Sequence, residues 1–131
     1  MGIKYLWDTN TVIYYLQQQF PLQSEKLIDE LLKDSGPAIS VITEIELLCW
    51  KTPFENDLKV LNNFIEEAFV IELDRDIKLK TAEIRKVHKV KLPDAVIAAT
   101  ALVYDAALVT RNVTDFKNID GLKLINPYET S

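Results

Sequence analysis

Four acidic residues of this 131-residue chain stand beside apolar segments, at positions from which their carboxylates could act together. Asp8 follows "IKYLW" and Glu46 lies in "TEIEL". Asp94 is the third residue of "LPDAVIAATAL", and Asp115 lies in "TDF". Carboxylate oxygens are the ligands that Mg²⁺ and Mn²⁺ prefer, and a cluster of uncompensated carboxylates usually implies a bound cation. If the fold brings the four together, the expected chemistry is metal-assisted attack on a phosphate.

Each acid also has an ordinary structural explanation. Asp8 can cap the helix that follows it, and Glu46 comes three residues after Thr43, which is the spacing of a capping box. Asp94 follows a proline at an expected helix start, where an acid suits the helix dipole, and Asp115 can serve in a turn or as a cap. For any one residue the structural explanation is the better one, but it does not account for four acids at one edge of a sheet.

Glu44 is an alternative to Glu46 as the second acid. The two side chains would lie about 200° apart around a helix, so only one of them should face a given cleft. The residue pattern by itself leaves this choice open.

Apolar, β-prone runs alternate with helical patterns along the chain. Strands are predicted over residues 3–7, 38–42, 69–73, 107–110 and 122–126. Helices are predicted from residue 11 onward and over 24–36, 43–51, 53–68, 76–90 and 93–106. This alternation is typical of a parallel sheet covered on both faces, so we predict one three-layer α/β/α domain over residues 1–131. In such sheets ligands bind beyond the carboxyl ends of the strands, which is where the acids fall.

For two of the helices, the sequence also predicts a cap or a buried face. Ser24 should cap the helix over 24–36. The helix over 53–68 should bury one apolar face, formed by Phe54, Leu58, Leu61 and Ile65.

The formal net charge of −5 and the pI of about 4.9 do not suggest a nucleic-acid-binding protein, whose surface is usually basic. They suit a cytosolic protein, or one whose carboxylates hold a cation. With a single cysteine and a single histidine a zinc site is not expected, and Cys49 in the apolar run "IELLCW" should be a packed thiol. The first residues do not form a signal peptide and no run is long enough to span a membrane, so a cytoplasmic location is expected.

Taken together, the motifs resemble those of PIN-domain ribonucleases. The matching stretches are "WDTN" (7–10), "ISVITEIEL" (39–47), "LPDAVIAATAL" (92–102), "LVTRNVTDF" (108–116) and "GLKLINP" (121–127). They cover almost the whole chain in the family's order and spacing, and within the family they look most like VapC-type toxins of bacterial toxin–antitoxin pairs. The resemblance implies a five-stranded parallel sheet of order 3-2-1-4-5, with the site between strands one and four.

Residue by residue, the resemblance assigns the catalytic and metal-holding roles to Asp8, Glu46, Asp94 and Asp115. Glu44 falls on a variable position of the second motif, so Glu46 is preferred. Further positions match polar residues that support the acids or touch water and substrate: Asn10, Thr43, Thr110 and Asn112. Many relatives carry an acid where this chain has Asn112, whose amide leaves one charge fewer for a second metal ion. The resemblance therefore implies one or two ions of Mg²⁺ or Mn²⁺.

The implied function is a Mg²⁺-dependent endoribonuclease that cleaves RNA by a metal-activated water. Such toxins are usually blocked by a small antitoxin encoded beside them, here a VapB-type chain, and homodimers are typical of the family. The aromatic residues Trp50, Phe54, Phe64 and Tyr104 could serve either interface, although packing in the core explains each of them at least as well.

The basic segment "RKVHKVK" (85–91) stands just before Asp94 and contains no acid. Together with Arg111, it supplies the candidate contacts to the RNA backbone: Arg85, Lys86, Lys89 and Lys91. The alternative is a solvated helix face, which is the better explanation for any single lysine.

Three other functions compete. A phospho-acceptor signalling domain also holds Mg²⁺ with carboxylates, but it needs an acid pair after strand one and a lysine after strand five, and this chain has neither. The intact acid set argues against a PIN-like domain that only binds RNA or a partner. An RNA-processing PIN nuclease without an antitoxin is the alternative within the enzyme class.

Overall fold

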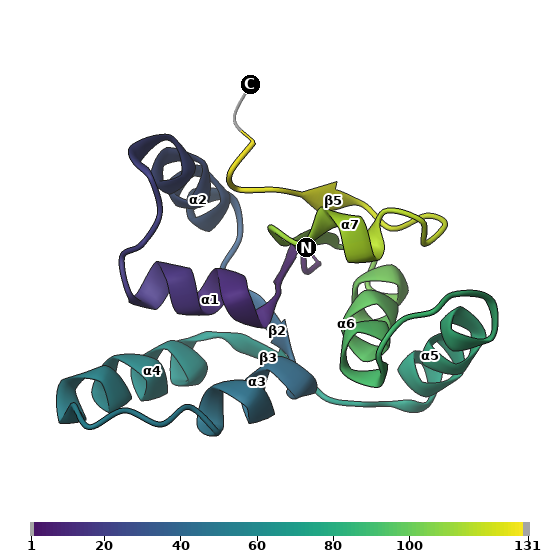
Figure 1. Cartoon of the computed structure of the whole chain (residues 1–131), viewed down its shortest axis with the longest axis horizontal. Helices are drawn as coiled ribbons and strands as arrows, with labels where there is room; N and C mark the ends of the chain where they lie inside the picture. Colours follow the sequence, from purple (N-terminus) through teal and green to yellow (C-terminus); the bar gives the residue numbers. More distant parts are fainter. Residues whose placement is uncertain (1, 130–131) are drawn as a thin grey trace.

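A five-stranded parallel sheet forms the centre of the protein (Figure 1). The structure is a computed structural model that describes residues 2–129. Its strands are β1 (Tyr5–Trp7), β2 (Ala38–Ser40), β3 (Phe69–Ile71), β4 (Ala107–Val109) and β5 (Leu124–Ile125), in the spatial order β3-β2-β1-β4-β5. Each of the neighbouring pairs is parallel. The predicted α/β class and the strand order are therefore confirmed.

Helices connect the strands and cover both faces of the sheet. They are α1 (Thr9–Leu16), α2 (Leu22–Asp34), α3 (Val41–Leu48), α4 (Glu55–Glu67), α5 (Arg75–Val87), α6 (Leu92–Val103) and α7 (Val113–Phe116). The helices α5 and α6 lie together on one side, and α1 to α4 lie on the other (Figure 1). No helix in the described part of the chain is long and apolar enough to cross a membrane.

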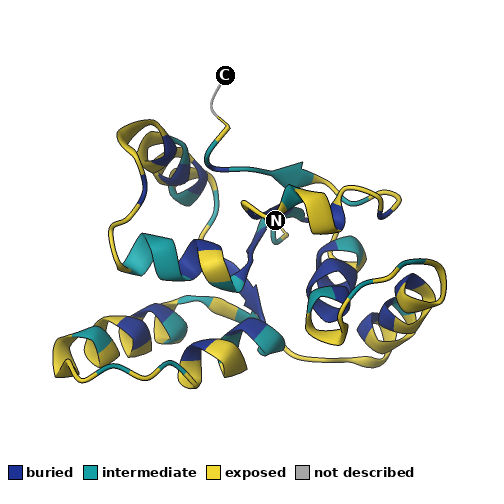
Figure 2. Ribbon diagram, viewed as in Figure 1, coloured by how far each residue is buried: buried dark blue, intermediate teal, exposed yellow. Residues whose placement is uncertain are grey.

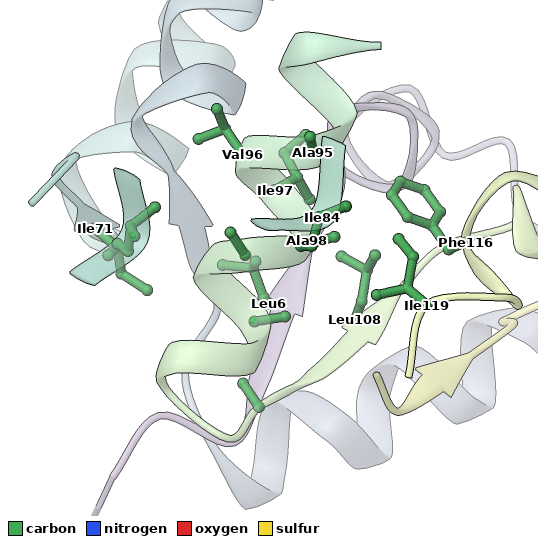
Figure 3. Packing of buried hydrophobic residues seen from close by; sticks show 14 of the residues in the cluster. Leu6, Ile71, Ile84, Ala95, Val96, Ile97, Ala98, Leu108, Phe116 and Ile119 are labelled. Carbon is green, nitrogen blue, oxygen red and sulfur yellow. The ribbon is translucent and has the colours of Figure 1, made fainter. Parts of the chain in front are cut away.

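Alternate residues of the strands point into two separate cores, as the pleat of a strand requires. Leu6 and Leu108 pack with α5 and α6, whereas Trp7 and Val109 pack with the helices of the other layer. All four side chains are at most 1% exposed. Figure 2 shows the buried residues concentrated on the sheet and on the inward faces of the helices, and Figure 3 shows Leu6 and Leu108 within the first core.

The helix α6 is apolar on all sides because the sheet covers one face of it and α5 covers another. Its residues Ala95, Ala98 and Ala99 are 0% exposed, and their small side chains let the helix lie close to its neighbours. Because α6 precedes β4 and runs back across the sheet, its first turn lies at the carboxyl edge of the strands. That turn contains Asp94.

The helix α3 begins two residues earlier than predicted. The strand β2 ends at Ser40, whose buried hydroxyl accepts a hydrogen bond from the backbone N–H of Thr43 at 3.2 Å. The predicted capping box of Thr43 and Glu46 is therefore wrong, because a serine at the strand end caps the helix and Thr43 lies inside its first turn. At the other end of the same helix, Cys49 is exposed and not packed as predicted.

The prediction that Ser24 caps α2 is also wrong. The helix begins at Leu22 behind Pro21, and Ser24 is buried within its first turn. Pro21 itself occupies the cap position, with φ −58° and ψ 157°, and no side chain forms a capping hydrogen bond there.

The buried face of α4 differs in part from the prediction. Leu61 and Phe64 are its buried residues, and Ile65 is half-buried. Phe54 and Leu58 are 66% and 38% exposed, because Phe54 precedes the helix and the first turn extends beyond the core (Figure 1).

Candidate active site

Asp8 is the first residue after β1 and lies at the carboxyl edge of the sheet. It caps α1, since its Oδ1 accepts a hydrogen bond from the backbone N–H of Thr11 at 2.8 Å. Its Oδ2 accepts a hydrogen bond from the hydroxyl of Thr110, the first residue after β4. The capping role is therefore confirmed, but only one of the two oxygens serves it. Each oxygen keeps a second lone pair, so a cap can also be a metal ligand.

The ends of β1 and β4 are fastened to each other next to Asp8. The backbone carbonyl of Val109 accepts hydrogen bonds from the N–H of Asp8 at 3.2 Å and from the hydroxyl of Thr11 at 2.9 Å. Asp8 is 7% exposed and Thr110 is fully buried, so the first acid is held rigidly. These two strands are also the place where the strand order reverses, which is where ligands bind in open α/β sheets.

Glu46 reaches this region from α3 and is oriented by two threonines. The hydroxyl oxygen of Thr9 lies 2.6 Å from Glu46 Oε1 and 3.1 Å from Thr43 Oγ1. A carboxylate only accepts, so the single proton of the Thr9 hydroxyl goes to Glu46 and the proton of the second bond comes from Thr43. Thr43 is fully buried, and it therefore fixes Thr9, which in turn fixes Glu46.

Thr9 is a site residue that the sequence analysis missed. Its place directly behind Asp8, in the first turn of the helix that Asp8 caps, was the available signal. Which acid its hydroxyl meets depends on how α1 and α3 cross, and the residue pattern does not determine that.

Asp94 lies in the first turn of α6 but caps nothing, because the cap position is Lys91 and no side chain bonds there. Burial raises the pKa of its carboxyl most, and the charges of Asp115, Glu46 and Asp8 raise it further. The ammonium of Lys91 acts in the opposite direction. The structure therefore brings the four predicted acids into one electrostatic environment, while Glu44 is not among the charges that act on Asp94.

Asp115 is exposed on α7 and is linked to the first acid by its neighbours. The side-chain amide of Asn112 donates a hydrogen bond to Asp115 Oδ2 at 2.7 Å. The backbone N–H of Asn112 donates to the Thr110 hydroxyl at 2.9 Å, and that hydroxyl bonds to Asp8. Asn10 is exposed in the first turn of α1, and its side chain makes no hydrogen bond within residues 2–129.

The four acids offer oxygen donors of the kind that a hard divalent cation binds. Burial raises the pKa of Asp94 most and repulsion from the other three acids raises it further, and a bound cation would relieve this repulsion. Within residues 2–129, no group of three or more acidic, histidine or cysteine side chains is placed so that it could hold a metal ion. The fit to a cation therefore rests on the donor chemistry and on the repulsion among the acids.

The basic segment 85–91 comprises the last residues of α5 and the loop that leads to α6. Arg85, Lys86, Lys89 and Lys91 are all exposed. The Nε of Arg85 donates to a backbone carbonyl of the loop between these helices at 3.1 Å, so this guanidinium also has a structural role. Lys91 lies close enough to Asp94 to lower the pKa of that carboxyl, which places a cation beside the acids.

Known proteins resemble this chain in sequence and in fold. The family model described as PIN domain matches residues 5–122. A search among curated protein sequences finds no significant match.

Solved structures of similar fold were also found. A chain of VapBC2 from Rickettsia felis, bound to a promoter DNA fragment, has a TM-score of 0.80 and 26% identity over 95% of this chain and 98% of that chain. A chain of DNA-bound VapBC from Salmonella typhimurium has a TM-score of 0.79 and 28% identity over 95% and 98%. A chain of a toxin–antitoxin complex from Klebsiella pneumoniae has a TM-score of 0.75 and 30% identity over 96% and 99%. The protein therefore belongs to the PIN-domain family, and it is similar in fold to chains of VapBC complexes and of a further toxin–antitoxin complex.

Proposed function

We propose that the protein is a metal-dependent endoribonuclease and the toxin of a VapBC-type toxin–antitoxin pair. The observation that carries the proposal is that four acids from four separate segments act on one another electrostatically, since the charges of Asp8, Glu46 and Asp115 raise the pKa of Asp94. Membership of a family of nucleases supports the reaction class, and similarity to chains of toxin–antitoxin complexes supports the biological role.

Asp8, Glu46, Asp94 and Asp115 would hold one or two ions of Mg²⁺ or Mn²⁺. When bound, such an ion activates water and neutralises the charge that develops on the phosphate. The chain's own contribution is orientation, because threonine hydroxyls and the Asn112 amide hold three of the four carboxylates in place. Hydrogen bonds of this kind orient the ligands of a metal ion and strengthen its binding.

The direct test is cleavage of RNA by purified protein with Mg²⁺, with Mn²⁺ and with a chelator. Asp94→Asn should abolish cleavage, because it removes a donor that the fold places among the other acids. Asp29→Asn, which removes an exposed carboxylate on α2, is the matched control and should cut RNA as the parent does. Cleavage by Asp94→Asn at the parental rate, or undiminished cleavage in excess chelator, would contradict the proposal.

The proposed partner is a VapB-type antitoxin. Co-expression of the short reading frame beside this gene should relieve growth inhibition caused by the protein and should block RNA cleavage in vitro. If the protein cleaves RNA but no adjacent reading frame neutralises it, an RNA-processing nuclease without an antitoxin becomes the better assignment.

A homodimer is proposed as the form in solution. Of the aromatic residues considered for an interface, Phe64 is buried within the chain, whereas Phe54 and Tyr104 are 66% and 37% exposed. Light scattering should therefore give about twice the chain mass of 15.0 kDa, and a mass of one chain would contradict the dimer.

A further inference from the structure

Arg111 stands between Thr110 and Asn112, which bond to two of the acids, and its side chain rests on an aromatic ring. Its guanidinium carbon is 4.2 Å from the centre of the Tyr128 ring, which is a cation–π contact. The Arg111 side chain is exposed and forms no ion pair within residues 2–129. Its charge is therefore available to a ligand, and its position is already defined by the ring.

The Tyr128 ring is itself fixed by other aromatic rings. Its centre lies 5.5 Å from that of Phe20 and 6.1 Å from that of Tyr14, and the Tyr14 contact is edge-to-face. The side chain of Asn126 accepts a hydrogen bond from the Tyr128 backbone N–H at 2.9 Å. Figure 1 shows the chain leaving β5 toward the side of α2, which brings this C-terminal segment back to the first helices.

The pair of Arg111 and Tyr128 adjoins the candidate active site on two sides. The residue before Arg111 bonds to Asp8, and the residue after it bonds to Asp115. Tyr14, which supports the ring, lies six residues beyond Asp8, or about 9 Å farther along α1. Arg111 therefore stands in the same short segment as the two residues that hold Asp8 and Asp115, and its guanidinium lies over the Tyr128 ring.

We propose that Arg111, supported by Tyr128, binds a base of the RNA by stacking. The inference rests on the proposed ribonuclease function and adds a base-binding position to it. A phosphate contact needs only a positive charge, which any lysine supplies. A guanidinium held over a tyrosine ring instead presents a flat, pre-oriented cation, and bases of single-stranded RNA stack on arginine planes and on aromatic rings. Stacking of this kind tolerates any base.

The experiment distinguishes contacts to the bases from contacts to the phosphate backbone. Binding is measured with the Asp94→Asn variant, which should not cut RNA. The measurement is repeated with the parent protein in chelator. One probe is a short oligoadenylate containing 2-aminopurine, whose fluorescence falls when the base stacks. The other is a strand of the same length and charge that lacks the bases. We expect the strand with bases to bind about tenfold more tightly and its fluorescence to be quenched.

Arg111→Lys keeps the positive charge and removes the planar guanidinium group. It should abolish the preference for bases and the quenching, and should leave binding of the base-free strand unchanged. Tyr128→Phe keeps the ring and should retain the preference, and Lys117→Ala removes an exposed cation just beyond α7 and should also retain it.

Three outcomes would overturn the inference. Equal binding of the two strands by the parent, or an Arg111→Lys variant that still prefers and quenches the base-bearing strand, would overturn it while leaving the ribonuclease proposal standing. Failure of the parent or of Asp94→Asn to bind the two strands would also overturn the inference, and cleavage of RNA by the parent with Mg²⁺ then decides the ribonuclease proposal separately.

Discussion

Asp94 is partly buried among three other carboxylates, and both features raise its pKa. Because that pKa is raised by folding, the folded chain holds a proton more tightly than the unfolded chain between the ordinary and the raised value. The free energy of unfolding of the metal-free protein should therefore fall as the pH rises through this window. Asp94→Asn removes the titrating group, so it should lessen this fall and stabilise the metal-free protein at neutral pH, while it abolishes cleavage.

Urea denaturation at a series of pH values, in chelator, measures this effect. Asp29→Asn is the control and should leave the pH dependence of stability as in the parent. If the free energy of unfolding depends on pH in the same way in the parent and in Asp94→Asn, the ionised Asp94 does not destabilise the folded protein.

Thr9 lies between Glu46 and the buried Thr43, so it should act as a positioning residue. Thr9→Val keeps the shape and removes the hydroxyl, and the protein should then bind Mn²⁺ about tenfold more weakly, as is typical when a group that orients a metal ligand is lost. Calorimetric titration with Mn²⁺ measures this without any RNA. Thr9→Ser restores the hydroxyl and should restore the affinity, and a Thr9→Val variant with parental affinity would contradict the assignment.

At the scale of elements, the close approach of α6 to its neighbours depends on small side chains. Ala98 is 0% exposed, so Ala98→Leu would force extra volume into a filled core and should lower the free energy of unfolding by about 1–3 kcal/mol. Ala82 on α5 is exposed, and Ala82→Leu should change stability by less than about 0.5 kcal/mol. Equal stability of the two variants in chemical denaturation would show that α6 has room above the sheet.

The elements were predictable in kind and order, and their ends were not. Strands and helices alternate in the apolar pattern, so the sheet and its two layers followed from the sequence. The apolar pattern could not show that β2 stops at Ser40. Ser40 is buried, and the apolar residues that follow it suit a longer strand as well as the start of a helix. The cap at Thr43 was placed wrongly for that reason, although Glu46 still lies on α3.

In the candidate site too, some features could be predicted from the sequence and others could not. The positions of Asp8 and Asp94 at the carboxyl edge of the sheet were predictable because each residue stands at the boundary of an apolar segment. Thr9 was not, because its role arises from the crossing of two helices that are far apart in the sequence. Tyr128 was not predicted for the same reason, since only the folded chain brings the C-terminal segment to Arg111.

At the scale of the whole molecule, the charges of opposite sign are unevenly placed. The formal net charge is −5, yet the segment 85–91 carries four exposed cations and ends three residues before Asp94. An acidic protein can therefore present a local basic approach to RNA, because binding responds to nearby charges more than to the average.

Replacement of Lys86, Lys89 and Lys91 by glutamine tests this approach. If each lysine neutralises one phosphate, the slope of log affinity against log salt should become less negative by about 2 for single-stranded RNA. Binding is measured across a salt series in the Asp94→Asn background, so that the RNA stays intact. The control replaces three exposed lysines on the helices of the other layer, Lys26, Lys33 and Lys59, and it changes the net charge by the same amount. Equal salt slopes for the two triple variants would show that RNA responds only to net charge, and an unchanged slope in the first would remove segment 85–91 from the RNA path.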